Sequence, residues 1–125
     1  MLKENREEIN YDSIIENIVK DLERKGYNEI KASLENYDHP TKLKRRQDNA
    51  EFVPDITAVK YGNKHYFEIA RKTEQEIKLV GKWQLLSTLS EMRNGKFRVY
   101  VPHGSMRFTN DILKKYDIHA DVVKI

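Results

Sequence analysis

The chain has 125 residues, of which 23 are Lys or Arg, 20 are Asp or Glu and none is Cys. This length fits one domain over residues 1–125, and the missing cysteines exclude a disulfide scaffold, a thiol nucleophile and Cys-ligated zinc. No apolar run is long enough to span a membrane, and the N-terminal residues lack the apolar stretch of a signal peptide, so we expect a cytoplasmic protein.

The charge is unevenly spread along the chain. Residues 1–40 hold 6 Lys and Arg against 10 Asp and Glu, whereas residues 41–83 hold 10 against 6. The densest basic cluster consists of Lys42, Lys44, Arg45 and Arg46. Such a cluster suits the phosphate backbone of a nucleic acid, although a solvated loop without a partner can have the same composition.

The N-terminal half begins with an amphipathic pattern. Apolar residues recur at spacings of three and four between Tyr11 and Leu22, and Gly26 provides a stop signal, so we expect a helix over this stretch. Apolar and polar residues then alternate over 30–34, which predicts a strand. Residues 36–50 are polar and contain the basic cluster, and we expect a long loop there.

A β-hairpin is predicted next. Residues 52–60 and 65–72 are rich in β-branched and aromatic side chains, which favour strands. The dipeptide Gly62-Asn63 between them is a hairpin signal. We therefore expect two antiparallel strands joined by a turn centred on this dipeptide.

The C-terminal half continues with two helices and two strands. Residues 73–76 form a capping box with Thr73 as the N-cap, which predicts a helix over about 74–93. Alternating apolar residues predict strands over 97–101 and 120–123, and Ser105 can cap a short helix between them. The predicted element order is α-β-β-β-α-β-α-β.

Counting outward from the predicted turn gives a hairpin register. Ile56 then lies opposite Ile69 and contributes to an apolar face. On the other face, Asp55 and Glu68 become diagonal neighbours, with Cβ atoms roughly 7–8 Å apart. Two carboxylates this close repel each other unless a cation lies between them, and Mg²⁺ or Mn²⁺ prefers such oxygen ligands. The alternative is that both are ordinary strand carboxylates paired with nearby Lys or Arg.

Pro54-Asp55, the hairpin and Glu68-Ile69-Ala70 together resemble the PD-(D/E)XK nuclease superfamily. The first helix and its exit resemble the opening of restriction-endonuclease-like and Holliday-junction-resolvase-like members, and the resemblance spans about residues 10–102. It implies an α/β fold with a restriction-endonuclease-like α-β-β-β-α-β core. In this core a mixed central sheet is flanked by helices, and here a C-terminal helix and strand follow it.

Matched by position, the resemblance implies a Mg²⁺ or Mn²⁺ site. Asp55 and Glu68 would be metal ligands, and the backbone carbonyl of Ile69 would be a further ligand. Glu16 would be a more distant ligand. The family's motif lysine orients or deprotonates the attacking water, or stabilises charge in the transition state, but this chain has Ala70 at that position.

Lys72 is the first candidate to replace the missing lysine. Strand alternation places it on the same face as Glu68 and Ala70, about 6.6 Å further along at ~3.3 Å per residue. A lysine side chain can reach back over that distance. Lys82, near the start of the following helix, is the second candidate. The alternative is that Lys72 is a surface lysine on a catalytically inactive relative.

The resemblance implies metal-dependent hydrolysis of phosphodiester bonds in nucleic acid, with DNA favoured over RNA. The basic cluster at 42–46 would hold flanking phosphates, and Lys82 and Gln84 would also contact nucleic acid. The competing interpretation, favoured by Ala70, is a catalytically inactive module of the same fold that binds nucleic acid or a protein partner. Resolvase-like relatives commonly dimerise, so a homodimer is also expected.

Overall fold

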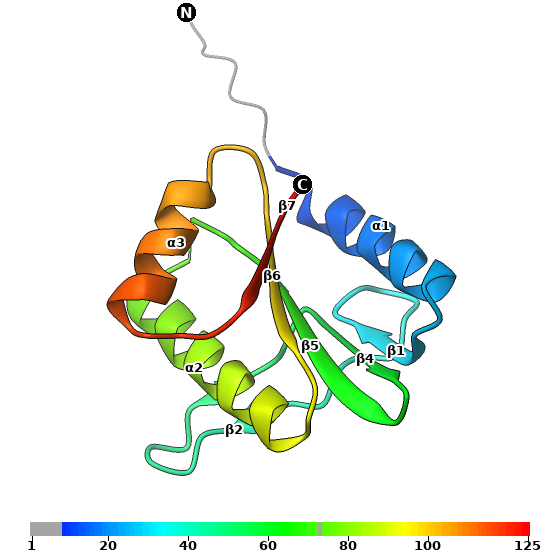
Figure 1. Cartoon of the computed structure of the whole chain (residues 1–125), viewed down its shortest axis with the longest axis horizontal. Coiled ribbons are helices and arrows are strands. Elements are labelled where there is room, and N and C mark those ends of the chain that lie inside the picture. Colours follow the sequence, from blue (N-terminus) through cyan, green and yellow to red (C-terminus); the bar gives the residue numbers. More distant parts are fainter. Residues whose placement is uncertain (1–8, 73) are drawn as a thin grey trace, which may run out of the picture.

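The chain forms a mixed β-sheet flanked by helices (Figure 1). The computed structural model describes residues 9–72 and 74–125. The helices are α1 (Tyr11–Arg24), α2 (Glu76–Met92) and α3 (Met106–Lys115). The strands are β1 (Asn28–Ala32), β2 (Leu43–Lys44), β3 (Glu51–Phe52), β4 (Ile56–Lys60), β5 (Asn63–Ile69), β6 (Phe97–Val101) and β7 (Asp121–Lys124).

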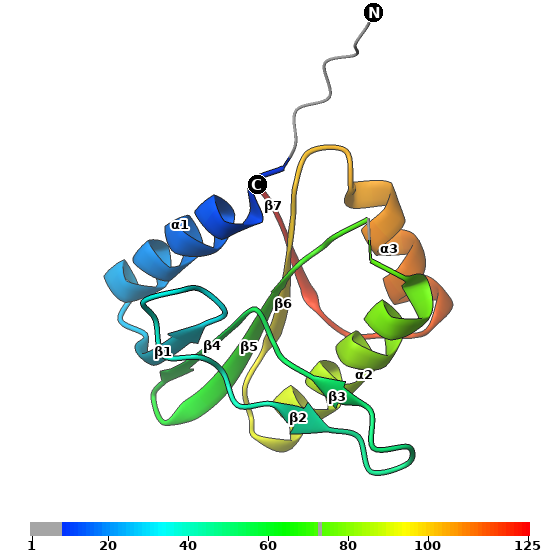
Figure 2. The same cartoon turned by 180° about the vertical axis from the view of Figure 1, so that it is seen from behind.

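Five strands form the main sheet in the order β1-β4-β5-β6-β7, and β2 and β3 form a separate two-stranded sheet. β4 is antiparallel to both β1 and β5, whereas β5, β6 and β7 run parallel to one another. Helix α1 packs against one face of the main sheet, and α2 and α3 cover the other, as Figures 1 and 2 show from opposite sides. The expected α/β class, with a mixed sheet flanked by helices, is therefore confirmed.

The amphipathic pattern near the N-terminus forms α1 as predicted. The side-chain oxygen of Asn10 caps the helix by accepting a hydrogen bond from the backbone N–H of Ser13 at 3.0 Å. The apolar stripe packs on the sheet and consists of Ile15, Ile18, Val19 and Leu22. The helix ends at Arg24, and Gly26 then adopts a φ of 88°, a left-handed conformation that glycine takes without strain.

The β4–β5 hairpin forms, but its turn lies one residue earlier than predicted. Tyr61 and Gly62 are the two turn residues, with φ values of 54° and 79°, and Lys60 pairs with Asn63. A two-residue turn with positive φ at both positions matches the right-handed twist of the flanking strands. The expected turn centred on Gly62-Asn63 is therefore wrong, because the glycine occupies the second turn position.

The hairpin register is accordingly shifted by two residues. Ile56 lies opposite Phe67 instead of the predicted Ile69. Because side chains alternate between faces with a period of two, the shift leaves every side chain on its predicted face. It also removes the predicted diagonal offset between the two carboxylates. Continuing the register one residue beyond the pair of Ile56 and Phe67 places Asp55 opposite Glu68.

The segment predicted as a long loop over 36–50 contains the first strand of a small hairpin, which corrects that expectation. β2 pairs antiparallel with β3, and Leu43 packs against the apolar core between α2 and the sheet. The guanidinium carbon of Arg45 lies 5.4 Å from the ring centre of Phe52. A methyl group at Gly81 would lie 2.7 Å from Arg45 Nη1, so this glycine allows the small hairpin to pack closely on α2.

The C-terminal elements follow the predicted order. Helix α2 begins at Glu76 with Gln75 as its N-cap, and the Gln75 side chain makes no capping hydrogen bond. Thr73, the predicted cap, lies outside the described residues. β6 and β7 begin and end within one residue of their expected ranges, and α3 begins directly after Ser105, its expected N-cap, whose side chain makes no capping hydrogen bond. In the part of the chain that the structure describes, no helix has the length and apolar character needed to cross a membrane.

His65 on β5 provides a pH-dependent test of how β5 contacts the residues just before β6. The backbone N–H of Lys96 donates to His65 Nδ1 at 3.0 Å, which requires that this ring nitrogen is unprotonated. Burial, assisted by the positive charge of Arg98, lowers the pKa of His65 from its ordinary value of 6.5. A base with a lowered pKa stabilises the fold fully above its unfolded-state pKa, and this contribution is lost as the pH falls.

We therefore expect the contribution of His65 to the free energy of unfolding, taken as the difference between the wild type and His65→Gln, to decrease as the pH falls from about 7 to about 5. Urea unfolding of both proteins at a series of pH values measures this difference. The imidazole resonances of His65 should also titrate below pH 6.5 in NMR spectra. A variant profile as steep as that of the wild type would contradict the described packing of His65.

Candidate active site

Asp55 and Glu68 lie side by side on the sheet face that α2 covers. Asp55 directly precedes β4, and Glu68 is the second-last residue of β5. One hydrogen bond joins them directly, from Asp55 N–H to Glu68 Oε2, and Ile69 N–H donates to Asp55 Oδ2, both at 2.8 Å. Both residues are buried, with exposed fractions of 4% and 1%. The hairpin thus brings the two carboxylates together on one face, as the sequence predicts.

Two side-chain cations neutralise this carboxylate pair. Arg71 Nη1 donates to Asp55 Oδ1 at 2.8 Å, and Lys82 Nζ lies 3.1 Å from Glu68 Oε1. Trp83 Nε1 also donates to Glu68 Oε1, at 3.3 Å. All four carboxylate oxygens therefore have an N–H partner. We refer to Asp55, Glu68, Arg71 and Lys82 as the charge cluster.

Burial dominates the electrostatics of the charge cluster. It raises the pKa of Glu68 to about 8, helped by the neighbouring charge of Asp55 and opposed by that of Lys82. Burial acts to lower the pKa of Lys82, but the charges of Glu68 and Asp55 outweigh it, so that pKa is raised. Each of these two groups therefore shifts the pKa of the other toward its charged form.

Lys82 reaches the carboxylate pair because it lies on the inward side of α2. The helix buries Leu79 and Trp83 against the sheet, and Lys82 between them is 8% exposed. Lys82 also lines a pocket of about 420 Å³ beside β3, together with Arg45 and Lys78 and with two acidic residues, Glu51 and Glu74. Lys82 therefore connects the buried carboxylates to a pocket between β3 and the start of α2.

The side chain of Lys72, the first candidate for the missing lysine, points away from the carboxylate pair. Its Nζ donates to the backbone carbonyl of Gly104 at 3.2 Å, in the connection between β6 and α3. Ala70 is fully buried, and its backbone N–H donates to the Tyr100 carbonyl. Of the two candidate lysines, it is therefore Lys82 that contacts Glu68.

Glu16 and Gln84 make no hydrogen bond or ion pair with the carboxylates among residues 9–72 and 74–125. Glu16 is exposed on α1, which packs against the opposite face of the sheet. Gln84 is exposed on α2. Their roles as a distant metal ligand and a nucleic-acid contact stay predictions, as does the role of the Ile69 carbonyl.

The predicted basic cluster lies on the small β2–β3 hairpin. Lys42 Nζ lies 3.5 Å from Glu51 Oε1, and Arg45 makes a bidentate pair with Asp48 at 2.6 and 3.0 Å. Lys44 and Arg46 are exposed. Because two of these four cations already have acidic partners, the cluster offers less free charge to a phosphate backbone than its sequence suggests.

Arg71 is the member of the charge cluster that the sequence interpretation did not include. Alternation along a continuous strand would place it on the face opposite Glu68. β5 ends at Ile69, however, so the chain leaves the sheet before this residue. The Arg71 guanidinium then lies 4.7 Å from the ring centre of Tyr11 while it bonds Asp55.

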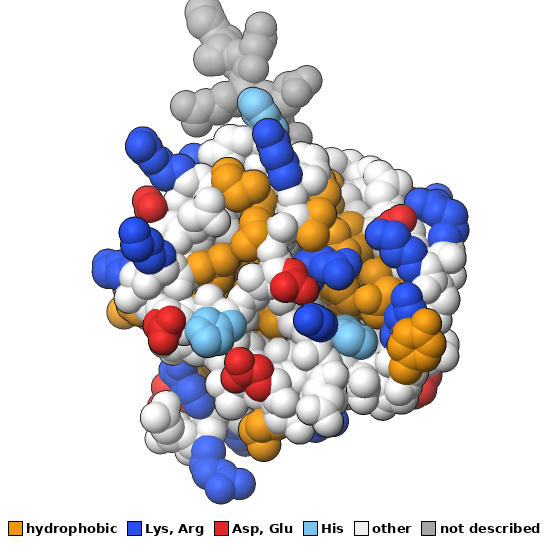
Figure 3. Space-filling view, in the orientation of Figure 1, with side chains coloured by type: hydrophobic (Ala, Val, Ile, Leu, Met, Phe, Trp, Pro, Cys, Tyr) orange, Lys and Arg blue, Asp and Glu red, His pale blue; other side chains and the backbone are white. Residues whose placement is uncertain are grey.

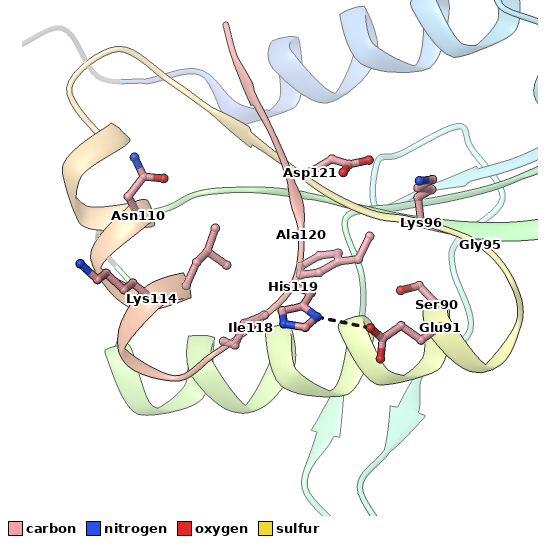
Figure 4. Close-up of a pocket in the computed structure, with 12 residues that line it drawn as sticks. Ser90, Glu91, Gly95, Lys96, Asn110, Lys114, Ile118, His119, Ala120 and Asp121 are labelled. Carbon is pink, nitrogen blue, oxygen red and sulfur yellow. Dashed lines mark ion pairs between the residues drawn. The ribbon is translucent and has the colours of Figure 1, made fainter.

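A larger pocket, of about 720 Å³, lies between the C-terminal half of α2, α3 and β7. Figure 4 shows its lining residues. The dashed line joins His119 to Glu91, whose Nδ1 and Oε2 atoms lie 3.5 Å apart. The pocket contains none of the predicted site residues and no member of the charge cluster. The candidate active site is therefore separate from this pocket.

The carboxylate oxygens of the charge cluster have the chemistry that Mg²⁺ and Mn²⁺ prefer. No three His, Asp or Glu side chains within 9–72 and 74–125 converge as a ligand group, so the cluster contributes two carboxylates. Backbone amides hold Asp55 Oδ2 and Glu68 Oε2, whereas side-chain cations hold Oδ1 and Oε1. A divalent cation fits this donor set if it takes over Oδ1 and Oε1 from Arg71 and Lys82, which together carry the same charge.

Compared with known protein families and with curated proteins, the chain matches no family model and no curated sequence. The superfamily resemblance and the homodimer therefore stay predictions.

Proposed function

We propose that the charge cluster is the active site of a metal-dependent hydrolase that cleaves phosphodiester bonds in nucleic acid, with DNA favoured over RNA. One observation carries the proposal: two carboxylates are buried side by side and one of them contacts a buried lysine. Burying three charged groups, with a fourth at Arg71 partly buried, costs more free energy than a packed apolar core of similar volume. Such costly groups with perturbed pKa values concentrate at functional sites.

The arrangement of the elements supports assignment to the PD-(D/E)XK superfamily. The order α1-β1-β4-β5-α2-β6 reproduces the α-β-β-β-α-β core, with β2 and β3 inserted between its first two strands. The strands of this core are neighbours in the sheet, and only the last pair is parallel. A fold alone does not establish a reaction, so the chemistry is argued from the charge cluster.

Within the proposed site, Asp55 Oδ1 and Glu68 Oε1 would hold Mg²⁺ or Mn²⁺. The bound ion would polarise the scissile phosphate and lower the pKa of an attacking water. The backbone N–H groups of Asp55 and Ile69 keep the other two oxygens in place, so both carboxylates remain oriented when their cation partners change. This preorganisation reduces the entropy lost on reaching the transition state.

Lys82 would replace the lysine that the superfamily carries at the position of Ala70. Its Nζ is 3.1 Å from Glu68 Oε1, and the residue also lines the pocket beside β3. Released from Glu68, the ammonium would stabilise negative charge that develops on the phosphate. Lys78 and Arg45 line the same pocket and would contact flanking phosphates.

A second candidate function is a catalytically inactive module that binds nucleic acid. It is favoured by the closed state of the charge cluster, in which every carboxylate oxygen has a protein partner and the charges balance. In that case Arg71 and Lys82 are permanent structural partners of Asp55 and Glu68, and no divalent cation displaces them.

Calorimetric titration of the metal-free protein with Mn²⁺ separates these two functions. We expect one specific site, and Asp55→Asn should weaken it by at least about tenfold, the loss seen even when an outer-shell partner is removed. The same variant should abolish Mg²⁺-dependent cleavage of DNA. Asp111→Asn is the matched control, since Asp111 is an exposed carboxylate on α3, outside the charge cluster and the pocket beside β3. Absence of a specific Mn²⁺ site in the wild type would exclude the hydrolase and leave the binding module.

A further inference from the structure

The β4–β5 turn carries an aromatic side chain in an unfavourable position. Tyr61 is 89% exposed and has a φ of 54°. The left-handed region is uncommon for a bulky residue, and this type of turn strongly prefers Asn, Asp or Gly at its first position. An exposed ring held in a strained conformation contributes nothing to the core, which directs attention to a role in binding.

Cations surround this end of the hairpin on both faces of the sheet. Lys60 Nζ lies 5.5 Å from the ring centre of Tyr61 and 5.0 Å from that of Tyr27. Figure 3 shows Lys, Arg and His side chains near the centre of that view, beside an acidic side chain. We use the term hairpin-end cations for Lys60 and Lys64 beside the turn together with the cations around Lys64 and His65, which are Lys31, Arg93, Lys96 and Arg98.

The hairpin-end cations repel one another and lack acidic partners. Within residues 9–72 and 74–125 none of the six forms an ion pair. Burial lowers the pKa of Lys64, and the charges of Arg93 and Lys31 lower it further. Glu29 and Asp121 are the nearby acids, and each offsets the repulsion only at a distance. A polyanion bound here would relieve this repulsion.

We propose that the hairpin end binds single-stranded nucleic acid, with a base stacked on Tyr61 and backbone phosphates on Lys60 and Lys64. An exposed aromatic ring beside unpaired cations is the combination that single-strand-binding surfaces use. The inference rests on the proposed function only in choosing nucleic acid as the polyanion. The turn lies at the opposite end of β4 and β5 from Asp55 and Glu68, so the strand would be held at a distance from the charge cluster.

Fluorescence anisotropy with a labelled single-stranded oligonucleotide, in EDTA, tests this site without any cleavage. Tyr61→Asn should weaken binding by about 5- to 150-fold, the loss expected for one stacked base. The same substitution should raise the midpoint of thermal unfolding, because asparagine suits the first position of this turn better than tyrosine. Lower affinity together with higher stability cannot result from a damaged fold.

Charge removal gives a second, independent readout. The double variant Lys60→Gln, Lys64→Gln should reduce the slope of log affinity against log salt by about 1.4, which is about 0.7 for each lost phosphate contact. The matched control Lys20→Gln, Lys124→Gln removes two exposed lysines from α1 and β7 and should change the slope little.

Equal affinity of the wild type and Tyr61→Asn would overturn the proposal, as would an equal loss in the lysine control. Failure of the wild type to bind single strands in EDTA would also overturn it. That result leaves the Mn²⁺ titration of the charge cluster unaffected, so the two proposals fail separately.

Discussion

Replacing Lys82 with methionine should lower the free energy of unfolding by about 3–5 kcal/mol, the usual cost of removing one partner from a buried ion pair. Methionine fills similar space on α2, so the loss comes from the charge left on Glu68, which is 1% exposed. Urea unfolding at about pH 9, where Glu68 of the wild type is ionised, measures the effect. The control is Lys78→Met one turn earlier, where the side chain is exposed and we expect a change within about 0.5 kcal/mol.

The double variant Lys82→Met, Glu68→Gln should recover most of this loss, because it removes both charges together. A double-mutant cycle from the four proteins then gives the coupling energy between the two side chains. A Lys82→Met loss no larger than that of Lys78→Met would show that the ion pair does not form in solution. Coupling near zero would show that Lys82 acts through packing alone.

The cost of Lys82→Met should also depend on pH, with a sign set by Glu68. Lys82 lowers the pKa of Glu68, so its removal raises that pKa further above the unfolded value of 4.5. An acid with a raised pKa destabilises the fold as the pH rises above its unfolded value. Both proteins share the unfolded value, so the two folded pKa values set the stability difference: it should grow as the pH rises through about 8 and shrink below that pH.

The amphipathic stripe of α1 and the alternation in β6 were sufficient to predict those elements, because periodicity depends only on which residues are apolar. The hairpin illustrates how far this reasoning extends. The turn chosen on Gly62-Asn63 was wrong by one residue, and the register by two. The predicted faces survived because a shift of two residues preserves alternation, so Asp55 and Glu68 were still expected on one side.

The partners of the carboxylates could not be predicted in the same way. Arg71 turns toward Asp55 only because β5 ends at Ile69, and strand ends are the least certain part of any sequence interpretation. Lys82 depends on how α2 rotates over the sheet, which its weakly periodic sequence does not specify. The β2–β3 hairpin was missed because two-residue strands carry too few side chains to show alternation.

In Mg²⁺-dependent DNA cleavage, the kcat values of the Lys82→Met and Lys72→Met variants should differ by about two to three orders of magnitude. Lys82→Met should lower kcat by about 10²- to 10³-fold, the loss typical for one group that stabilises transition-state charge. Lys72→Met should leave kcat within about threefold, since Lys72 bonds the Gly104 carbonyl away from the carboxylates. Single-turnover rates below the unfolding transition of each variant measure both effects without a contribution from lost fold.

Lys82→Arg distinguishes a chemical role for Lys82 from a structural one. Arginine keeps the positive charge beside Glu68 and should restore most of the stability, but its larger planar group cannot occupy the position of an ammonium at the phosphate. We therefore expect Lys82→Arg to be folded like the wild type yet slower by at least about tenfold. Full activity in Lys82→Met, combined with a large loss in Lys72→Met, would instead assign the role of the displaced lysine to Lys72, just after β5. Such a result would require Lys72 to leave Gly104 and reach back along the strand when substrate binds.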